Sequence, residues 1–350
     1  MLKSSKINMS RAHVLRSNLN SIFANLAAEE ALLIRLVSKP VLFLWRNNPT
    51  ITVGRHQNPW KECNLNLMDE AGVTLARRYS GGGAVYQDLG CTTFTFLHEM
   101  TPSSSVTELV DGNFDMLVEA LRVLGIPAAR KGRNDVVVGE SKVSGSAFKQ
   151  TSSRLVHHGT ILVNTDMSNL GRFLTPSKLK LTSKGISSVS ARVSNLTDTV
   201  ASMDHETVCD SLIKEFRKKY GCESGDPAEI VDEFIQSDPV FIRHHDQLRD
   251  RQWRFGSTPQ FSHTVETRID GIGMFTCHYE VEREIITCVK IFSDILNAQL
   301  IDRFESALKG CVYERSAVLE RLFDETAESD DQQSIRVIKK FTEWILNEMF

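Results

Sequence analysis

The stretch from Arg77 to Tyr86 reads Arg-Arg-Tyr-Ser-Gly-Gly-Gly-Ala-Val-Tyr and lies between segments rich in β-branched and apolar residues. Three consecutive glycines are costly in chain entropy, so they indicate a backbone that needs unusual dihedral angles or close approach. Peptide N–H groups in such a loop can bind a phosphate, and Arg78 would add positive charge. The spacing fits neither a Walker loop nor a GxGxxG fingerprint. A flexible hairpin loop is the alternative.

The segments on either side of this loop show a succession of strand and helix patterns. Apolar residues at helical spacing predict helices over residues 21–37, 106–124 and 206–220. β-branched and aromatic runs between polar turns predict strands at 41–45, 51–53, 73–77, 84–86, 92–97, 135–138, 142–148 and 156–163. The pattern weakens between residues 225 and 254, and we expect a linker near the end of that stretch.

The character of the chain changes after residue 255. Three strand patterns at 262–269, 274–282 and 285–292 predict a small antiparallel sheet, and helical patterns follow at 296–308, 317–323 and 335–349. Strands followed by helices are typical of an α+β domain. Because 350 residues exceed what one ordinary core fills, the sequence predicts a large domain followed by a smaller one.

The composition excludes several classes of protein. Hydrophobic residues make up 41% and charged residues 24%, the balance of a soluble globular protein, and the longest apolar run, 41–45, is far too short to span a membrane. A net charge of −3 argues against a broad nucleic-acid surface. Seven scattered cysteines without a CxxC indicate free thiols in a reducing compartment and no structural zinc.

The first 28 residues contain no Asp or Glu, whereas Lys3, Lys6, Arg11 and Arg16 are basic and serines are frequent. This composition suits a mitochondrial transit peptide, and an ordinary loose N-terminus is the alternative.

Two further segments carry side chains that suit a ligand site. Asn134 and Asp135 follow Gly-Arg, and Lys142 opens the segment Lys-Val-Ser-Gly-Ser-Ala, where its ammonium could reach a phosphate or carboxylate and Asp135 could hold magnesium. His157 and His158 precede Gly159 on a predicted strand, so they face opposite sides and only one can line a site; His158 is favoured. The alternatives are a solvated lysine, a turn-forming aspartate and a core histidine.

In this order the segments resemble the lipoate–protein ligase family, from about residue 17 to the C-terminus. Arg-Arg-x-Ser-Gly-Gly-Gly-Ala-Val-Tyr-x-Asp-Leu-Gly, Gly-Arg-Asn-Asp, Lys-Val-Ser-Gly-Ser-Ala and His-His-Gly-Thr all fit, as do Lys-Gly-Ile-Ser-Ser-Val at 184–189 and Arg-Val-x-Asn-Leu at 192–196. Upstream, Gly-Arg-His-Gln-Asn-Pro-Trp at 54–60 is similar to mitochondrial lipoyltransferases of the family. In the second domain, Trp253-x-Phe255-Gly256 and Gly310-Cys311 fit as well.

The resemblance implies a mixed-sheet α/β catalytic domain of the biotin/lipoate ligase type, followed by a small accessory α+β domain. It also implies a two-step reaction: lipoate and MgATP give lipoyl-AMP and pyrophosphate, and an acceptor lysine then takes the lipoyl group as an amide. The implied acceptors are the lipoyl domains of 2-oxoacid dehydrogenase E2 subunits and the glycine-cleavage H protein. We expect lipoate or octanoate as the small substrate, no nucleic-acid or membrane partner, and a monomer.

The resemblance also assigns roles to residues. Lys142 would be catalytic and would contact both lipoate and nucleotide, and Asp135 would bind Mg²⁺. The nucleotide would further contact Arg78, Gly83, Ala84, Val85, Tyr86 and Asn134, and lipoate would further contact Ser80, Gly81, Gly82, His158 and Gly159. Three residues depart from the family pattern: Tyr79, Gln87 and Cys91.

Other activities fit the sequence less well. An octanoyltransferase needs a cysteine after the lysine to carry the acyl group, and none occurs between Cys91 and Cys209. A biotin–protein ligase would carry an arginine-rich phosphate loop, which is absent. A lipoyltransferase that uses preformed lipoyl-AMP or protein-bound lipoyl groups is the serious alternative, and an inactive module that docks lipoyl domains is a weaker one.

The resemblance divides the chain into a short mitochondrial targeting segment at 1–16, a catalytic domain at 17–245 and an accessory domain at 255–350. We expect the protein in the mitochondrial matrix, with the cytoplasm as the alternative.

Overall fold

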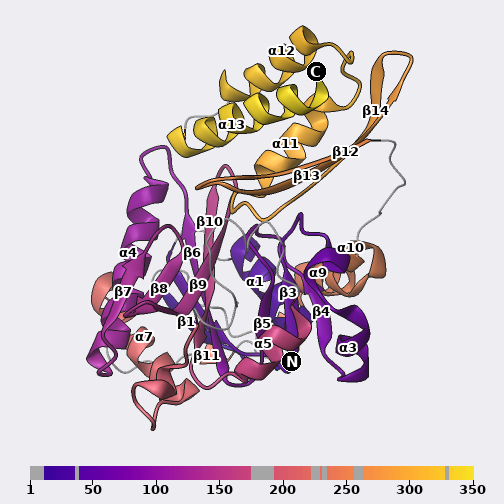
Figure 1. Cartoon of the computed structure of the whole chain (residues 1–350). Coiled ribbons are helices and arrows are strands. Elements are labelled where there is room, and N and C mark those ends of the chain that lie inside the picture. Colours follow the sequence, from indigo (N-terminus) through magenta and orange to yellow (C-terminus); the bar gives the residue numbers. More distant parts are fainter. Residues whose placement is uncertain are drawn as a thin grey trace.

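The structure is a computed structural model that describes residues 12–35, 39–174, 193–221, 229–230, 235–255, 263–327 and 331–350. Two units are visible in Figure 1: a large one built on a mixed sheet, and a smaller one of three strands and three helices above it. The predicted mixed-sheet α/β unit followed by a small C-terminal α+β unit is confirmed.

An eight-stranded sheet forms the centre of the large unit. Its order is β11 (Glu229–Ile230), β1 (His13–Arg16), β2 (Val41–Trp45), β6 (Cys91–Glu99), β10 (Arg154–Leu162), β9 (Ser141–Gln150), β8 (Asp135–Val138) and β7 (Ala128–Lys131). β1 runs parallel to both of its neighbours, and the other pairs are antiparallel. The sheet is therefore mixed.

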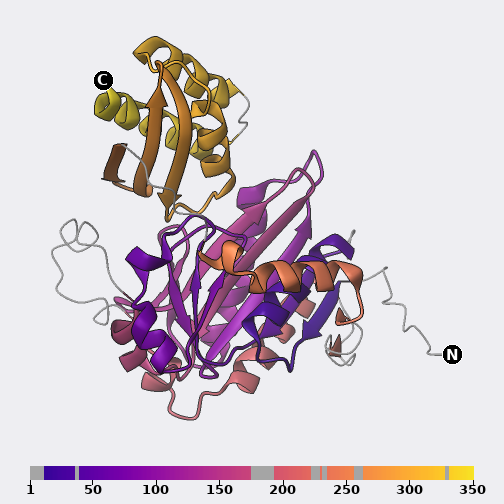
Figure 2. The ribbon, with the colours of Figure 1, turned by 90° about the vertical axis from the view of Figure 1, so that its right-hand side faces the viewer.

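Helices cover both faces of this sheet (Figure 2). α4 (Val106–Val123) and α7 (His205–Tyr220) pack on one face, and α1 (Ile22–Arg35) with α9 (Pro239–Arg249) packs on the other. Strand β2 is apolar at every position because Leu42 and Leu44 face α4 and α7, while Phe43 and Trp45 face α1. A strand buried on both faces reads as a continuous apolar run instead of an alternating one.

A three-stranded sheet lies beside α1 in the order β4 (Thr74–Arg77), β3 (Thr50–Val53) and β5 (Val85–Gln87). Its core also takes side chains of α3 (Leu65–Glu70) and α5 (Met167–Phe173). The short helix α2 (Pro59–Glu62) and the 3-10 helix Leu196–Asp198 complete the regular elements of this part. The glycine-rich loop connects β4 to β5.

The C-terminal unit is an antiparallel meander of β12 (His263–Ile269), β13 (Gly273–Glu282) and β14 (Ile285–Ser293). α11 (Gln299–Leu308), α12 (Arg315–Ala327) and α13 (Gln332–Met349) pack on it, and the rings of Phe304 and Phe341 stack at 4.1 Å. Across the described part of the chain, no helix is both long and apolar enough to cross a membrane.

Two predicted boundaries differ from the structure. Residues 13–16 were assigned to a targeting segment, but they form β1 inside the sheet, and Arg16 pairs with Glu206 and Asp210 of α7. The catalytic domain was predicted to end at 245, yet α9 packs on α1 and α10 (Arg251–Phe255) on β4. In α10, Trp253 Nε1 donates to the carbonyl of Arg77 at 2.9 Å. β1 reads His-Val-Leu-Arg, which contains no run of β-branched or aromatic residues and so gives no clear strand pattern.

Candidate functional site

The glycine-rich loop has the special backbone that its sequence predicts. Gly82 has a φ of +88°, a region that L-residues rarely adopt. A Cβ on Gly54 would lie 2.2 Å from the carbonyl oxygen of Gly82, so two backbone segments approach closely there. The loop is held in place by these contacts, which is the conformational reason for its glycines.

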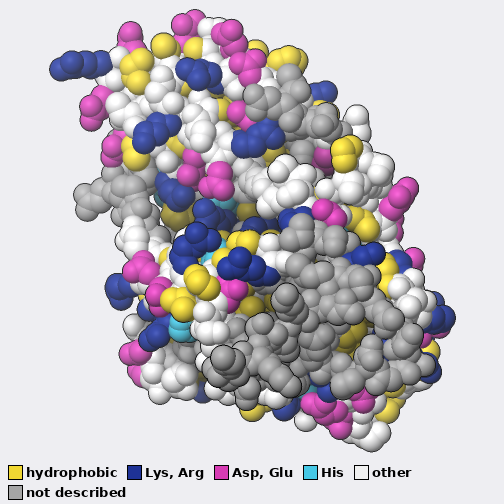
Figure 3. Space-filling model, turned by 180° about the vertical axis from the view of Figure 1, so that it is seen from behind, with side chains coloured by type: hydrophobic (Ala, Val, Ile, Leu, Met, Phe, Trp, Pro, Cys, Tyr) yellow, Lys and Arg dark blue, Asp and Glu magenta, His cyan; other side chains and the backbone are white. Residues whose placement is uncertain are grey.

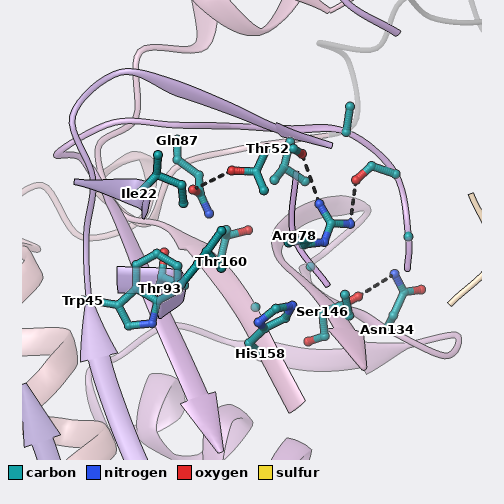
Figure 4. Close-up of a pocket in the computed structure, with 18 of the residues that line it drawn as sticks. Ile22, Trp45, Thr52, Arg78, Gln87, Thr93, Asn134, Ser146, His158 and Thr160 are labelled. Carbon is teal, nitrogen blue, oxygen red and sulfur yellow. Dashed lines mark hydrogen bonds between the residues drawn. The ribbon is translucent and has the colours of Figure 1, made fainter. Parts of the chain in front are cut away.

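A cavity of about 150 Å³ lies between this loop, α1 and the large sheet (Figure 4). Arg78, Asn134 and Lys142 form a polar end. Away from it, the apolar side chains of Ile22, Leu26 and Trp45 line the wall together with Gln87, Thr93 and Thr160 (Figure 4). The remaining lining residues are Thr52, Gly82, Gly83, Ala84, Val85, Gly145, Ser146, Ala147, His158 and Gly159. A cavity with apolar side chains in its wall and charged groups at one end suits a molecule with an alkyl chain and an anionic head.

Lys142 and Asp135 lie together at the polar end. The Nζ of Lys142 on β9 is 2.6 Å from Oδ1 of Asp135 on β8, and about a third of each side chain is exposed. The backbone of Lys142 also forms a bridge with Val193, and Ser194 N donates to the carbonyl of Lys142 at 3.0 Å. Asn134 is fixed beside them, since its Nδ2 donates to the carbonyl of Ser146.

Adjacent His157 and His158 face opposite sides of β10, which confirms the sequence argument. His157 is enclosed by aromatic side chains, with the rings of Phe114 and Phe148 at 4.9 and 4.6 Å, and burial lowers its pKa well below the ordinary value. His158 lines the cavity. The core-histidine alternative therefore holds for His157 and fails for His158.

Glu29 lies behind His158 and was missed by the sequence analysis. His158 Nδ1 is 2.8 and 3.0 Å from the two carboxylate oxygens of Glu29, and Thr95 Oγ1 donates to one of them at 2.7 Å. Burial by itself raises the pKa of the Glu29 carboxyl, but the interaction with His158 and the Thr95 hydrogen bond bring it below the ordinary value. A carboxylate between Leu26 and Leu33 on the apolar stripe of a predicted helix was the available signal.

The guanidinium of Arg78 is buried and bonded mainly to the loop itself. It donates to the carbonyls of Thr52, Gly81 and Gly83 at 2.6–3.2 Å and through Nε to Ser80 Oγ at 3.0 Å. Burial lowers the pKa of this guanidinium to about 10, so it stays charged at neutral pH. Among the described residues, these acceptors leave one N–H on Nη1 for a ligand.

Most of the other predicted site residues meet at the cavity, but three do not line it. Gly82, Gly83, Ala84, Val85 and Gly159 are lining residues. The Tyr86 ring packs against Phe173, and its hydroxyl accepts a hydrogen bond from Asn169. Gly81 faces the C-terminal unit, because a Cβ there would lie 2.1 Å from the carbonyl oxygen of Ile295. Ser80 is buried behind the lining, where its Oγ lies 2.6 Å from His158 Nε2.

The C-terminal unit contacts the glycine-rich loop directly. The N–H of Gly82 donates to the carbonyl of Ile295 at 2.9 Å, and the N–H of Ser293 donates to the carbonyl of His56 at 2.7 Å. Figure 3 shows Lys and Arg side chains gathered in the middle of one face, where the two units meet. The motif at 184–189 and Arg192 lie outside the described residues.

A magnesium ion at this site would have one carboxylate ligand from the protein, that of Asp135. Asp135 is half-buried at the polar end of the cavity. Among the residues that the structure describes, no three His, Cys, Asp or Glu side chains lie close enough together to hold a metal ion. Magnesium is commonly bound by one or two carboxylates together with substrate phosphates and water, so a single aspartate fits an ion that arrives with a nucleotide.

Family models match both units of the chain. The catalytic domain of lipoyl protein ligases A/B matches residues 21–217, and the C-terminal domain of bacterial lipoate protein ligases matches residues 258–345. A lipoate-protein ligase A from Psychrobacter cryohalolentis is 42% identical over 344 residues, which cover 97% of this chain and 99% of that protein.

Solved structures show the same likeness. P. falciparum LipL1 in complex with lipoate is 33% identical with a TM-score of 0.84, over 96% of this chain and 99% of that one. A lipoate-protein ligase A bound with ATP is 27% identical with a TM-score of 0.60, over 70% and 98%. The bipartite ligase of Thermoplasma acidophilum, described with its E2 lipoyl domain, is 28% identical with a TM-score of 0.60, over 72% and 98%. With the catalytic and C-terminal domains both matched and a lipoate-protein ligase A aligned over 97% of its length, this chain is an enzyme of the lipoate–protein ligase family.

Proposed function

We propose that this enzyme activates lipoate with ATP and transfers the lipoyl group, through lipoyl-AMP, to a lysine of an acceptor protein. The observation that carries the proposal is the position of Lys142, which lies where the cavity meets the glycine-rich loop. The proposal is also supported by relatives described in complex with lipoate and with ATP.

In the first step a carboxylate oxygen of lipoate forms a bond to the α-phosphorus of ATP, and pyrophosphate leaves. This step joins two anions, so charge neutralisation and alignment matter more than acid–base chemistry. The ammonium of Lys142 would lie between the carboxylate and the α-phosphate, and the amides of Gly83 and Ala84 would face the phosphate. Asp135 would hold the magnesium ion, which offsets the negative charge of the phosphates when bound.

In the second step the acceptor amine attacks the carbonyl carbon of the mixed anhydride, and AMP leaves. Lys142 remains beside the anhydride and stabilises the charge on the departing phosphate. The alkyl chain would lie along the apolar part of the cavity wall, beside Ile22, Leu26 and Trp45. An eight-carbon acyl chain, whether lipoyl or octanoyl, is the substrate class that these walls suit.

The proposed acceptors are the lipoyl domains of 2-oxoacid dehydrogenase E2 subunits and the glycine-cleavage H protein. The description of the archaeal ligase together with its E2 lipoyl domain supports the first of these classes. A mitochondrial location stays a prediction, and because β1 begins at His13, a removable targeting segment would have to end before that residue.

A transferase that only uses preformed lipoyl-AMP is the second candidate function, because recognising the adenylate needs nearly the same residues as making it. We expect robust transfer from lipoyl-AMP to an apo lipoyl domain, with slower ATP-dependent activation. Lipoate-dependent exchange of labelled pyrophosphate into ATP measures the activation step alone. Transfer without exchange above the level of a Lys142→Ala control would leave the transferase as the function.

Gly145 gives a prediction about how Lys142 is positioned. A Cβ on Gly145 would lie 2.5 Å from Lys142 Nζ and 2.6 Å from its Cε, with no other atom closer than 3.9 Å. Gly145→Ala should therefore leave the protein folded but displace the ammonium, and we expect lipoyl transfer to fall at least ~10-fold, because a misplaced group loses its alignment. Steady-state transfer and thermal unfolding measure the two effects.

Gly171→Ala is the matched control, because nothing lies within 4 Å of a Cβ at that position. It should leave transfer unchanged and should not lower the melting temperature, because alanine favours the helix α5 more than glycine does. Equal activity in Gly145→Ala and Gly171→Ala would show that the Lys142 side chain has another productive position.

A further inference from the structure

We propose that Glu29 is a positioning residue for the nucleotide half of the site, acting through His158 and Ser80 on Arg78. The inference deepens the proposed function and rests on it, since it assigns a role in binding the adenylate. Glu29 lies on α1, on the other side of His158 from the glycine-rich loop. None of the sequence motifs that indicate the family includes it.

The four side chains form one continuous hydrogen-bonded row. Glu29 is 2.8 Å from His158 Nδ1, His158 Nε2 is 2.6 Å from Ser80 Oγ, and Arg78 Nε donates to the same Oγ at 3.0 Å. Each of the four residues is buried, with exposed fractions between 1% and 6%. Burial at that level excludes water as a competing partner, so the row sets the orientation of its members.

The end groups of the row fix the direction of two of its hydrogen bonds. An ionised Glu29 only accepts, so Nδ1 of His158 donates to it, and the Nε–H of Arg78 donates to the hydroxyl oxygen of Ser80. Ser80 Oγ and His158 Nε2 share the hydrogen bond between these two. The negative carboxylate at one end and the positive guanidinium at the other are thus joined through two side chains.

Arg78 in turn fixes the orientation of peptide groups in the loop. Its Nη2 donates to the carbonyls of Gly81 and Gly83 at 2.6 and 2.8 Å. A trans peptide points its N–H opposite to its carbonyl, so holding Gly83 O turns the N–H of Ala84 away from the arginine. The peptide after Gly81 shows the same effect, because the N–H of Gly82 reaches the carbonyl of Ile295.

The row therefore assigns Arg78 to organising the loop more than to contacting phosphate. Its charge is balanced by the Glu29 carboxylate, which lies behind His158, and most of its N–H groups are already bonded to protein. If Glu29 were removed, no anion would balance the buried guanidinium of Arg78, and the loop peptides would lose their fixed orientation.

The test measures the affinities of two probes: lipoate alone, and a non-hydrolysable sulfamoyl analogue of lipoyl-AMP. We expect Glu29→Gln to weaken binding of the analogue at least ~10-fold, the scale of one hydrogen bond to a charged group, while lipoate affinity changes less than ~3-fold. Ser80→Ala removes the middle of the row with little change in volume, and it should have the same effect even if Glu29→Gln folds poorly.

Two further variants separate positioning from a loss of structure. A lysine at position 78 lacks the Nε–H group that donates to Ser80. In an Arg78→Lys background, adding Glu29→Gln should therefore cost no further affinity for the analogue. Glu30→Gln is the matched control, because Glu30 is the neighbour on α1, is equally buried at 3% exposure, and pairs with Lys149 instead of His158. It should bind the analogue as the wild type does.

Folded Glu29→Gln and Ser80→Ala proteins that bind the analogue with wild-type affinity would overturn the proposal, as would equal losses for lipoate and the analogue. Failure of the wild type itself to bind the analogue would instead count against the proposed function.

Discussion

Lipoyl transfer should fall at least ~100-fold in a Lys142→Ala variant, the scale of removing one preorganised electrostatic donor from a transition state. The reason is the position of the ammonium, which lies at the polar end of the cavity beside Asp135 and beside the loop that would receive the phosphate. Because about a third of each partner in this ion pair is exposed, its loss should cost little stability. Initial rates of lipoylation of an apo lipoyl domain, together with circular dichroism, measure both effects.

Lys131→Ala supplies a control for the loss of a lysine from the same sheet. Lys131 on β7 forms an exposed ion pair with Glu140, away from the cavity, so its removal should leave transfer at the wild-type rate. Near-normal turnover of a well-folded Lys142→Ala protein would remove Lys142 from the mechanism. A loss in both variants would point to a general disturbance of the sheet.

Gly82→Val should be the second most damaging change, and its effect should appear in nucleotide binding. A valine at a φ of +88° is strained by about 2 kcal/mol or somewhat more, and its Cβ would lie 2.9 Å from Arg78 Nη2. The substitution would therefore push the guanidinium off the carbonyls that it holds. We expect affinity for a non-hydrolysable lipoyl-AMP analogue to fall at least ~10-fold, with a smaller effect on lipoate alone.

Gly139→Val separates backbone strain from damage to the site. Gly139 also has a positive φ, of +57°, but it lies in the turn between β8 and β9 with nothing within 4 Å of a Cβ. It should lower the melting temperature through backbone strain alone and leave the affinity for the analogue intact. If Gly82→Val loses stability while its folded fraction binds normally, the loop is structural and does not bind the ligand.

Local sequence patterns predicted most of the secondary structure. Strands β2 and β8 have the predicted bounds, and helices α4 and α13 begin or end within a few residues of the predicted positions. β1 and β7 were missed because His-Val-Leu-Arg and Ala-Ala-Arg-Lys contain no run of β-branched or aromatic residues, whereas the equally short β8 reads Asp-Val-Val-Val. Helices α9 and α10 were missed because their pattern is weak in sequence.

In the site, too, features set by neighbouring residues could be predicted, whereas contacts between distant segments could not. The positive φ at Gly82 and the opposite orientations of His157 and His158 follow from backbone geometry within a few residues, and the structure confirms both. The contact between Gly81 and Ile295 could not be predicted, because it depends on where a separate domain packs against the loop.

The sequence by itself therefore determined the order of the elements, the strained glycine loop and the presence of a lysine, an aspartate and a histidine suited to the chemistry. Only the tertiary structure decided which of these side chains meet. Lys142 contacts Asp135 because a hairpin pairs their strands, but Glu29 contacts His158 across 129 residues of chain. Periodicity reports which face a residue occupies, whereas the partner on that face is set by the packing of α1 on the sheet, which no local pattern encodes.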